Sequence, residues 1–148
     1  MASATEAEVL PGLVVHLDTD ELRRLGGSST NAETSAGQDR AVAGPHYFLI
    51  VSASADQCVA VPLFSRYAPG SERLQEQLKF GLPDKWRGED SYFSKWQHWH
   101  IPISCVAAAS GTEESSAQDR RGYAANRPEV LAAIESWQDK NRAPYRAL

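Results

Sequence analysis

Alternation of apolar and polar positions predicts β-strands in the first half of the chain. Residues 12–18 place every second apolar side chain on one side of an extended backbone. Residues 46–52 are rich in β-branched and aromatic residues and predict a central strand. A short connection leads to a second apolar run at residues 58–65, so the two segments are expected to form a hairpin. Pro62 lies in this run, which places part of that strand at a sheet edge or a bulge.

A further strand is predicted over residues 96–106, where aromatic, imidazole and aliphatic side chains alternate. A period of two puts the more apolar side chains on a face that should point to the core: Trp99, Ile101, Ile103 and Cys105. The opposite face should point outward and would carry Trp96, His98 and His100.

Three segments carry helix signals. Residues 19–25 begin with acidic and end with basic side chains, followed by Gly26. Residues 71–78 begin with a serine and contain a pair of leucines four residues apart. The strongest signal follows Asn126, where a proline and a glutamate favour a helix start. This amphipathic helix would end before Pro144 and bury Val130, Leu131, Ile134 and Trp137.

Between these elements, small and polar residues dominate. Residues 26–44 and 107–122 are expected to form mobile loops, and residues 1–10 a flexible N-terminus, because such segments bury little apolar surface. Several short strands with one long helix at the end predict a single domain over residues 1–148. The predicted fold is mainly β with helices, an SH3-like small barrel with a C-terminal amphipathic helix.

Composition narrows the classes of function. The chain has 15 basic and 19 acidic residues and a net charge of -4, which argues against a protein that holds nucleic acid mainly by neutralising phosphates. No apolar run approaches the roughly 20 residues that span a bilayer, and the first residues lack the basic and apolar parts of a signal peptide. A cytoplasmic protein without membrane contact is expected. Cys58 and Cys105 lie in apolar runs and are expected to be buried free thiols.

Metal and cofactor chemistry find little support in the sequence. His98 and His100 would project two imidazoles from one side of a strand, a geometry that transition metals use, but no third ligand is evident. Serine-hydrolase signatures, phosphate-binding glycine loops and dinucleotide fingerprints are absent. The expectation is therefore a protein without metal or cofactor.

The order of the predicted elements resembles the PemK/MazF/Kid family of bacterial toxins. The shared pattern is a first strand after Gly12, a long polar loop, a strand ending in Ser52, a Val-Pro strand ending in Ser65, and a C-terminal helix. The likeness covers residues 12–65 and the last helix. It implies an SH3-like barrel, metal-independent cleavage of RNA, an antitoxin-like protein partner and a homodimer.

Several positions differ from the family pattern at sites that matter for chemistry. The family commonly has Arg-Pro where this chain has His46 and Tyr47, and a threonine implicated in the active site is replaced by Phe64. Ser65 matches the family serine, while Leu13 stands where an acidic residue is usual. Cleavage through the 2'-hydroxyl of RNA requires a group that accepts a proton and groups that stabilise charge on the phosphate.

These considerations predict a site and leave two functions open. His46 and Ser65 are the predicted catalytic residues, and the predicted substrate contacts are Arg66, Lys95, Trp96, His98 and His100. Tryptophan would stack on bases and imidazoles would contact phosphate or move protons. In the alternative interpretation, Trp96 covers the end of the barrel and the imidazoles are simply solvated. The function is then either RNA binding with endoribonuclease activity, or that of an inactive module binding a protein or peptide partner. A third hypothesis is that the chain is a purely structural domain.

Overall fold

The computed structural model describes residues 4–32, 41–67, 71–74, 79–80, 90–94, 97–112, 122–124, 131–133 and 145–148. The fold is mainly β with few helices, as the sequence predicts. The strands are β1 (Leu13–Asp18), β2 (Ser29–Thr30), β3 (Pro45–Ala53), β4 (Gln57–Phe64), β5 (Ser71–Arg73), β6 (Lys79–Phe80), β7 (Tyr92–Ser94), β8 (Trp99–Pro102), β9 (Gly122–Ala124) and β10 (Arg146–Ala147). The helices are the 3-10 turn η1 (Glu6–Glu8), α1 (Thr19–Leu25) and α3 (Ile103–Ser110).

All paired strands run antiparallel. The main path of the sheet is β10-β2-β8-β4-β3-β1-β9-β6, and β7 joins β4 on one side and β5 on the other. The predicted hairpin is confirmed, because β3 and β4 pair from Phe48 opposite Pro62 to Ala53 opposite Cys58. A register shift between Ile50 and Ser52 marks a bulge in β3, which increases local twist.

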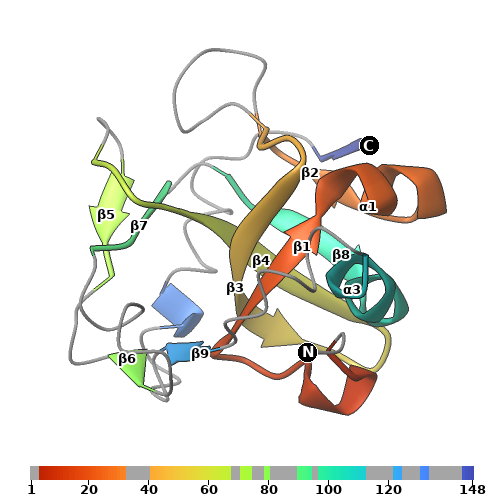
Figure 1. The fold of residues 1–148 in the computed structure, drawn as a ribbon, viewed down its shortest axis with the longest axis horizontal. Coiled ribbons are helices and arrows are strands. Elements are labelled where there is room, and N and C mark those ends of the chain that lie inside the picture. The colour runs from red at the N-terminus through yellow and green to blue at the C-terminus, as the bar shows by residue number, and fades with distance from the viewer. Residues whose placement is uncertain are drawn as a thin grey trace.

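Pro62 lies where β4 changes its neighbour. On one side, β4 pairs with β8 through Ala60 and with β7 from Leu63 onward. Proline has no N–H to donate, so it suits a position between the pairing of β4 with β8 and the pairing of β4 with β7. The sequence predicts an edge or a bulge at this residue. The change of partner carries β5 and β7 away from the rest of the sheet (Figure 1).

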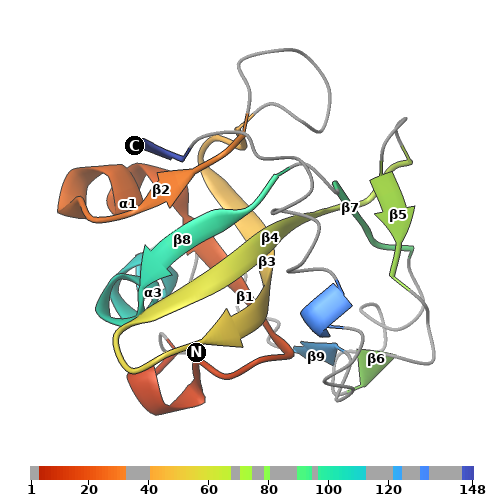
Figure 2. The same ribbon diagram turned by 180° about the vertical axis from the view of Figure 1, so that it is seen from behind.

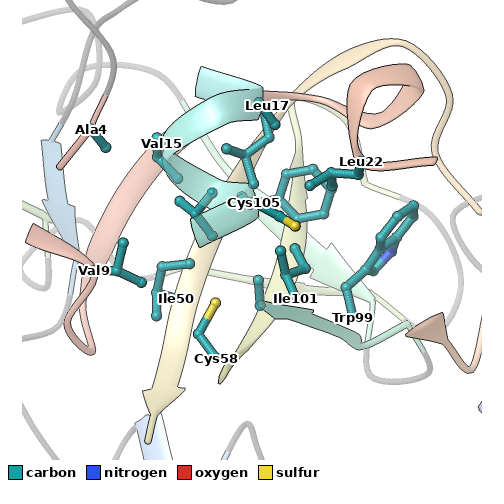
Figure 3. Packing of buried hydrophobic residues seen from close by; sticks show 14 of the residues in the cluster. Ala4, Val9, Val15, Leu17, Leu22, Ile50, Cys58, Trp99, Ile101 and Cys105 are labelled. Atoms are coloured by element: carbon teal, nitrogen blue, oxygen red, sulfur yellow. The ribbon is translucent and has the colours of Figure 1, made fainter. Parts of the chain in front are cut away.

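Two hydrophobic cores lie on opposite faces of the sheet. The larger core is closed by α1, α3 and η1, which lie on one side of the strands (Figures 1 and 2). Apolar side chains from β1, β3, β4 and β8 meet these helices (Figure 3). Trp99, Phe48 and Ile101 are among the fully buried members of this core. The second core packs Leu74, Phe93 and Leu131 against the other face. Its strand residues are Val14, Leu49, Val51, Val61 and Leu63.

Two predicted elements are wrong in type. Ser71–Arg73 forms strand β5 instead of a helix, because it pairs with β7. The strand predicted over residues 96–106 is shorter, since β8 ends at Pro102 and Ile103–Ser110 forms α3. Proline favours a helix start and the following alanines favour helix continuation. Ile103 and Cys105 still reach the core, but from this helix. The loop predicted over 107–122 accordingly begins inside α3 and ends at β9.

Segments expected to be exposed are partly packed. Ser28, Thr30 and Asn31 are buried polar residues around β2, within the predicted loop 26–44. The backbone N–H of Ala4 donates to Ser110 Oγ at 2.8 Å, so the described part of the N-terminus packs on α3. Hydrogen bonds to polar groups, together with burial of Ala4, Val9 and Val42 in the larger core, hold these segments in place.

The remaining expectations concern the C-terminal helix and the membrane. Residues 131–133 are helical and Leu131 is buried, in agreement with the predicted amphipathic helix, whose other residues lie outside the described part of the chain. Among the described helices, none has the length and apolar character needed to cross a bilayer.

Candidate functional site

Aromatic side chains from β3, β4 and β7 form a row across one face of the sheet. The rings of His46 on β3 and Phe64 on β4 lie 5.1 Å apart, centroid to centroid. Phe64 pairs with Tyr92 on β7, and Tyr92 pairs with Arg73 on β5. Residues directly opposite each other in antiparallel strands point to the same face. Tyr67 adds its ring to Tyr92 at 6.0 Å in a T-shaped arrangement. We call His46, Phe64, Tyr67 and Tyr92 the aromatic row.

The outer end of the aromatic row is open to solvent. Tyr67 is 67% exposed, the most exposed of the large hydrophobic side chains in the described part of the chain. Ser65 and Arg66, two of the predicted site residues, are exposed immediately before it. Arg73 forms a salt bridge with Asp90 at 3.0 Å, with both side chains about half exposed. The exposed end therefore combines the largely exposed ring of Tyr67 with the arginines Arg66 and Arg73.

The inner end is formed by His46, which is largely desolvated. Burial lowers the pKa of His46, a hydrogen bond with the backbone of Leu63 opposes this effect, and nearby His16 lowers the pKa further. Its Nε2 atom is buried and has no hydrogen-bond partner in the described part of the chain. The side chain is therefore a neutral imidazole near pH 7, in contact with the rings of Phe48 and Phe64.

A second imidazole, His16, lies beside this region on β1. His16 pairs with Tyr47 on β3, and their rings pack edge to face at 4.6 Å. Burial lowers the pKa of His16, while the carboxylate of Asp18 opposes the change. Because Leu17, not His16, lies opposite His46 in the register, the two imidazoles project from opposite faces of the sheet.

The predicted outward face of β8 is not outward. His98 is fully buried, against the prediction, because β2 packs along β8. The backbone N–H of His98 donates to Asn31 Oδ1 at 2.7 Å, and Thr30 Oγ1 donates to the carbonyl of His98 at 2.8 Å. His100 is half-buried and its ring lies 4.1 Å from that of Tyr145. The alternation in the sequence gives no sign of β2 or β10, since both strands are only two residues long.

The predicted site residues divide between two places. His46 packs on Phe48 of the larger core, whereas His100 pairs with Val59, whose side chain packs on the second core. Phe64 and Val59 are separated by five positions along β4, which corresponds to roughly 16 Å in an extended strand. The structure thus brings His46, Ser65 and Arg66 to one end of β4 and puts His98 and His100 elsewhere. Lys95 and Trp96 lie outside the described residues.

Sequence reasoning missed Tyr67, Tyr92 and Arg73. The signal for Tyr67 is its position three residues after the end of β4, beyond the polar residues Ser65 and Arg66. Tyr92 and Arg73 meet only because β5 and β7 pair, and the sequence favours a helix where β5 forms. These three residues nevertheless make the exposed half of the site.

Neither thiol nor metal chemistry is favoured by the described side chains. Cys58 and Cys105 are buried free thiols, as predicted, and burial raises the pKa of Cys58 to about 12. A neutral thiol is a poor nucleophile. The described residues include no group of three or more histidine, cysteine, aspartate or glutamate side chains placed to hold a metal ion.

The site is therefore a row of side chains on one face of the sheet. Its outer end carries the exposed ring of Tyr67, and its inner end carries the desolvated imidazole of His46. No protein-family model, no curated protein and no solved structure matches this chain.

Proposed function

We propose that this protein binds single-stranded RNA on the aromatic row and does not cleave it. The observation that carries the proposal is the exposed ring of Tyr67 beside Tyr92, with Arg66 next to it. Unpaired bases stack on aromatic side chains and on guanidinium planes, and a sheet face that presents several rings suits this contact. Stacking does not require a strongly basic protein, which is compatible with the net charge of -4.

Binding without cleavage is favoured by the inner end of the aromatic row. The resemblance to PemK/MazF/Kid toxins aligns positions 46 and 64 with the family's arginine and active-site threonine. In this chain the two positions are adjacent and hold a neutral imidazole packed on a phenyl ring. Neither group supplies the positive charge or hydroxyl donor that would stabilise a phosphate transition state. The Ser65 hydroxyl, the remaining match, is at the exposed end of the strand.

A protein or peptide partner, such as an antitoxin-like segment, is the second candidate. Two observations favour it: the net charge of -4, and the ion pair that already neutralises Arg73. Tyrosine and arginine are enriched in the central contacts of protein interfaces. The aromatic row fits such a partner through Tyr67, Tyr92 and Arg66.

Binding is tested by fluorescence anisotropy with labelled single-stranded RNA of mixed sequence. We expect Tyr67→Ala and Tyr92→Ala each to weaken binding by about 1–3 kcal/mol, the usual loss when one stacked base is released. Arg23→Ala is the matched control, because this exposed arginine lies on α1, across the molecule from β7 (Figures 1 and 2). Absence of RNA binding, together with a protein partner whose binding requires Tyr67, would favour the second candidate.

Cleavage is tested on the same RNA by gel electrophoresis after long incubation with the wild-type chain. The proposal expects intact RNA and normal growth of cells that express the protein. RNA fragments that disappear with His46→Ala or Ser65→Ala, but not with Arg23→Ala, would show that the chain is a nuclease and overturn this part of the proposal.

A further inference from the structure

Strand β2 is firmly joined to the sheet on one side. It pairs with β8, with Ser29 opposite His100 and Thr30 opposite Trp99. Hydrogen bonds from the Thr30 hydroxyl and to the Asn31 carboxamide hold the backbone of His98, and Asn31 is 1% exposed. The inner side of β2 is therefore fixed by buried polar contacts, which are expensive to break.

On its other side, β2 is covered by β10 and by the two residues that flank it, Tyr145 and Leu148. Strand β10 adds two paired residues, Arg146 opposite Thr30 and Ala147 opposite Ser29, and both are exposed. The Arg146 guanidinium donates to the carbonyl of Ala32 at 2.7 Å, and the N–H of Leu148 donates to the carbonyl of Ser28 at 3.2 Å. A two-residue ladder with exposed side chains contributes little free energy. The other contacts of this segment are the Tyr145 ring on His100 and the Leu148 side chain against the larger core.

The two sides of β2 thus differ in how strongly they are held. If β10 departs, β2 remains in the sheet and presents an unpaired edge, with the carbonyls of Ser28 and Ala32 left as free acceptors. Such an edge accepts another extended segment by strand addition. We propose that β2 is an acceptor edge for an extended peptide segment of a partner protein, which binds in place of residues 145–148.

The contacts of β10 define the chemistry of that segment. An aromatic ring would lie on His100, as Tyr145 does at 4.1 Å. The next residue would be an arginine that reaches the Ala32 carbonyl, followed by a small residue and then an aliphatic one, since Leu148 packs on the larger core. The expected partner motif is therefore aromatic, arginine, small, aliphatic, in an extended conformation. This inference is independent of the aromatic row, which lies on β3, β4 and β7.

The test uses the full chain and a fluorescent peptide with the sequence Tyr-Arg-Ala-Leu. Arg146→Ala removes the guanidinium contact, so β10 should be displaced more easily. We expect the peptide to bind this variant about tenfold more tightly than the wild-type chain, because the competing segment occupies the edge for less of the time. Tyr145→Ala, which removes the ring from His100, should act in the same direction. A peptide with alanine in place of its arginine should bind weakly to both variants.

Arg23→Ala is the matched control and should bind the peptide as the wild type does. Circular dichroism establishes that each variant is folded. Equal peptide affinity for wild type and both β10 variants, or no binding to any of them, would overturn the proposal. A wild-type dimer that Arg146→Ala dissolves would assign the edge to the β10 segment of a second copy, and would overturn the assignment to a partner protein.

Discussion

His46 and Phe64 are joined across β3 and β4 by an edge-to-face contact, with ring centroids 5.1 Å apart and ring planes inclined by 61°. The contact links the larger core to the exposed end of the aromatic row, because Phe64 packs partly on that core and pairs with Tyr92. The ring at position 64 is therefore expected to contribute to stability.

Truncation of this ring should be costly. We expect Phe64→Ala to lower the free energy of unfolding by about 2–3 kcal/mol, less than for a fully buried phenylalanine because Phe64 is only partly buried. Tyr67→Ala should change it by less than about 0.5 kcal/mol, since that ring is mostly exposed. Urea unfolding of both variants measures the difference. Equal losses of unfolding free energy in the two variants would contradict the expectation that Phe64 contributes more to stability than Tyr67.

The neutral state of His46 predicts a pH dependence of stability. Burial lowers the pKa of His46 below the ordinary value of 6.5, so the unfolded chain takes up a proton first as the pH falls. The buried neutral His46 therefore costs no stability above pH 6.5, and the free energy of unfolding declines progressively below that pH on account of this residue. His16 acts in the same direction. We expect His46→Gln to reduce the slope of unfolding free energy against pH in this window. An unchanged slope would contradict the proposed desolvation of His46.

The strand segments that could be predicted from sequence share one property: their β-branched and aromatic residues form a local apolar run, which is buried against a core on each face. Residues 12–18 and 46–52 fall into this class, and both strands lie in the middle of the sheet. The segment at Ser71–Arg73 has helix signals, yet it forms β5 because pairing with β7 outweighs local preference. Such pairing depends on distant residues and has no local signature.

The candidate site was predictable only in part, for a similar reason. His46, Ser65 and Arg66 meet because they are near the ends of a predicted hairpin. The period of two continues from Trp99 through Cys105, which concealed the start of α3 at Ile103. The alanines and Gly111 were the available signal for this helix. The burial of His98 depends on β2, whose two residues carry no pattern.

Substitution by alanine should lower the free energy of unfolding more at Gly27 than at Gly44. Both have positive φ, of 87° and 69°, so alanine is strained at either position. A Cβ on Gly27 would also approach Pro102 Cγ to 3.1 Å, whereas a Cβ on Gly44 would meet no atom within 4 Å. We expect Gly27→Ala to lower the unfolding free energy by about 2–3 kcal/mol and Gly44→Ala by about 1 kcal/mol. Thermal denaturation compares them, and the reverse order would refute the close approach to Pro102.

The side chain of Gln97 should be essential for packing around Trp99. Its Oε1 accepts hydrogen bonds from the indole Nε1 of Trp99 at 2.9 Å and from the backbone N–H of Val42 at 3.2 Å. Gln97→Leu would leave both buried donors unpaired, and we expect a loss of about 2–5 kcal/mol. Gln57→Leu, at the exposed start of β4, is the control and should be nearly neutral. Chemical denaturation with tryptophan fluorescence measures both, and a neutral Gln97→Leu would contradict the bonding.

The position of β4 between the two cores has a consequence for how the protein unfolds. Strand β4 contributes Cys58 and Ala60 to one core and Val61 and Leu63 to the other, so a single backbone segment is a wall of both. Loosening of either core removes support from the strand that the other core needs. The helix-covered layer and the layer around Phe93 are therefore expected to melt as one cooperative unit, with the amides of β4 exchanging only on global unfolding.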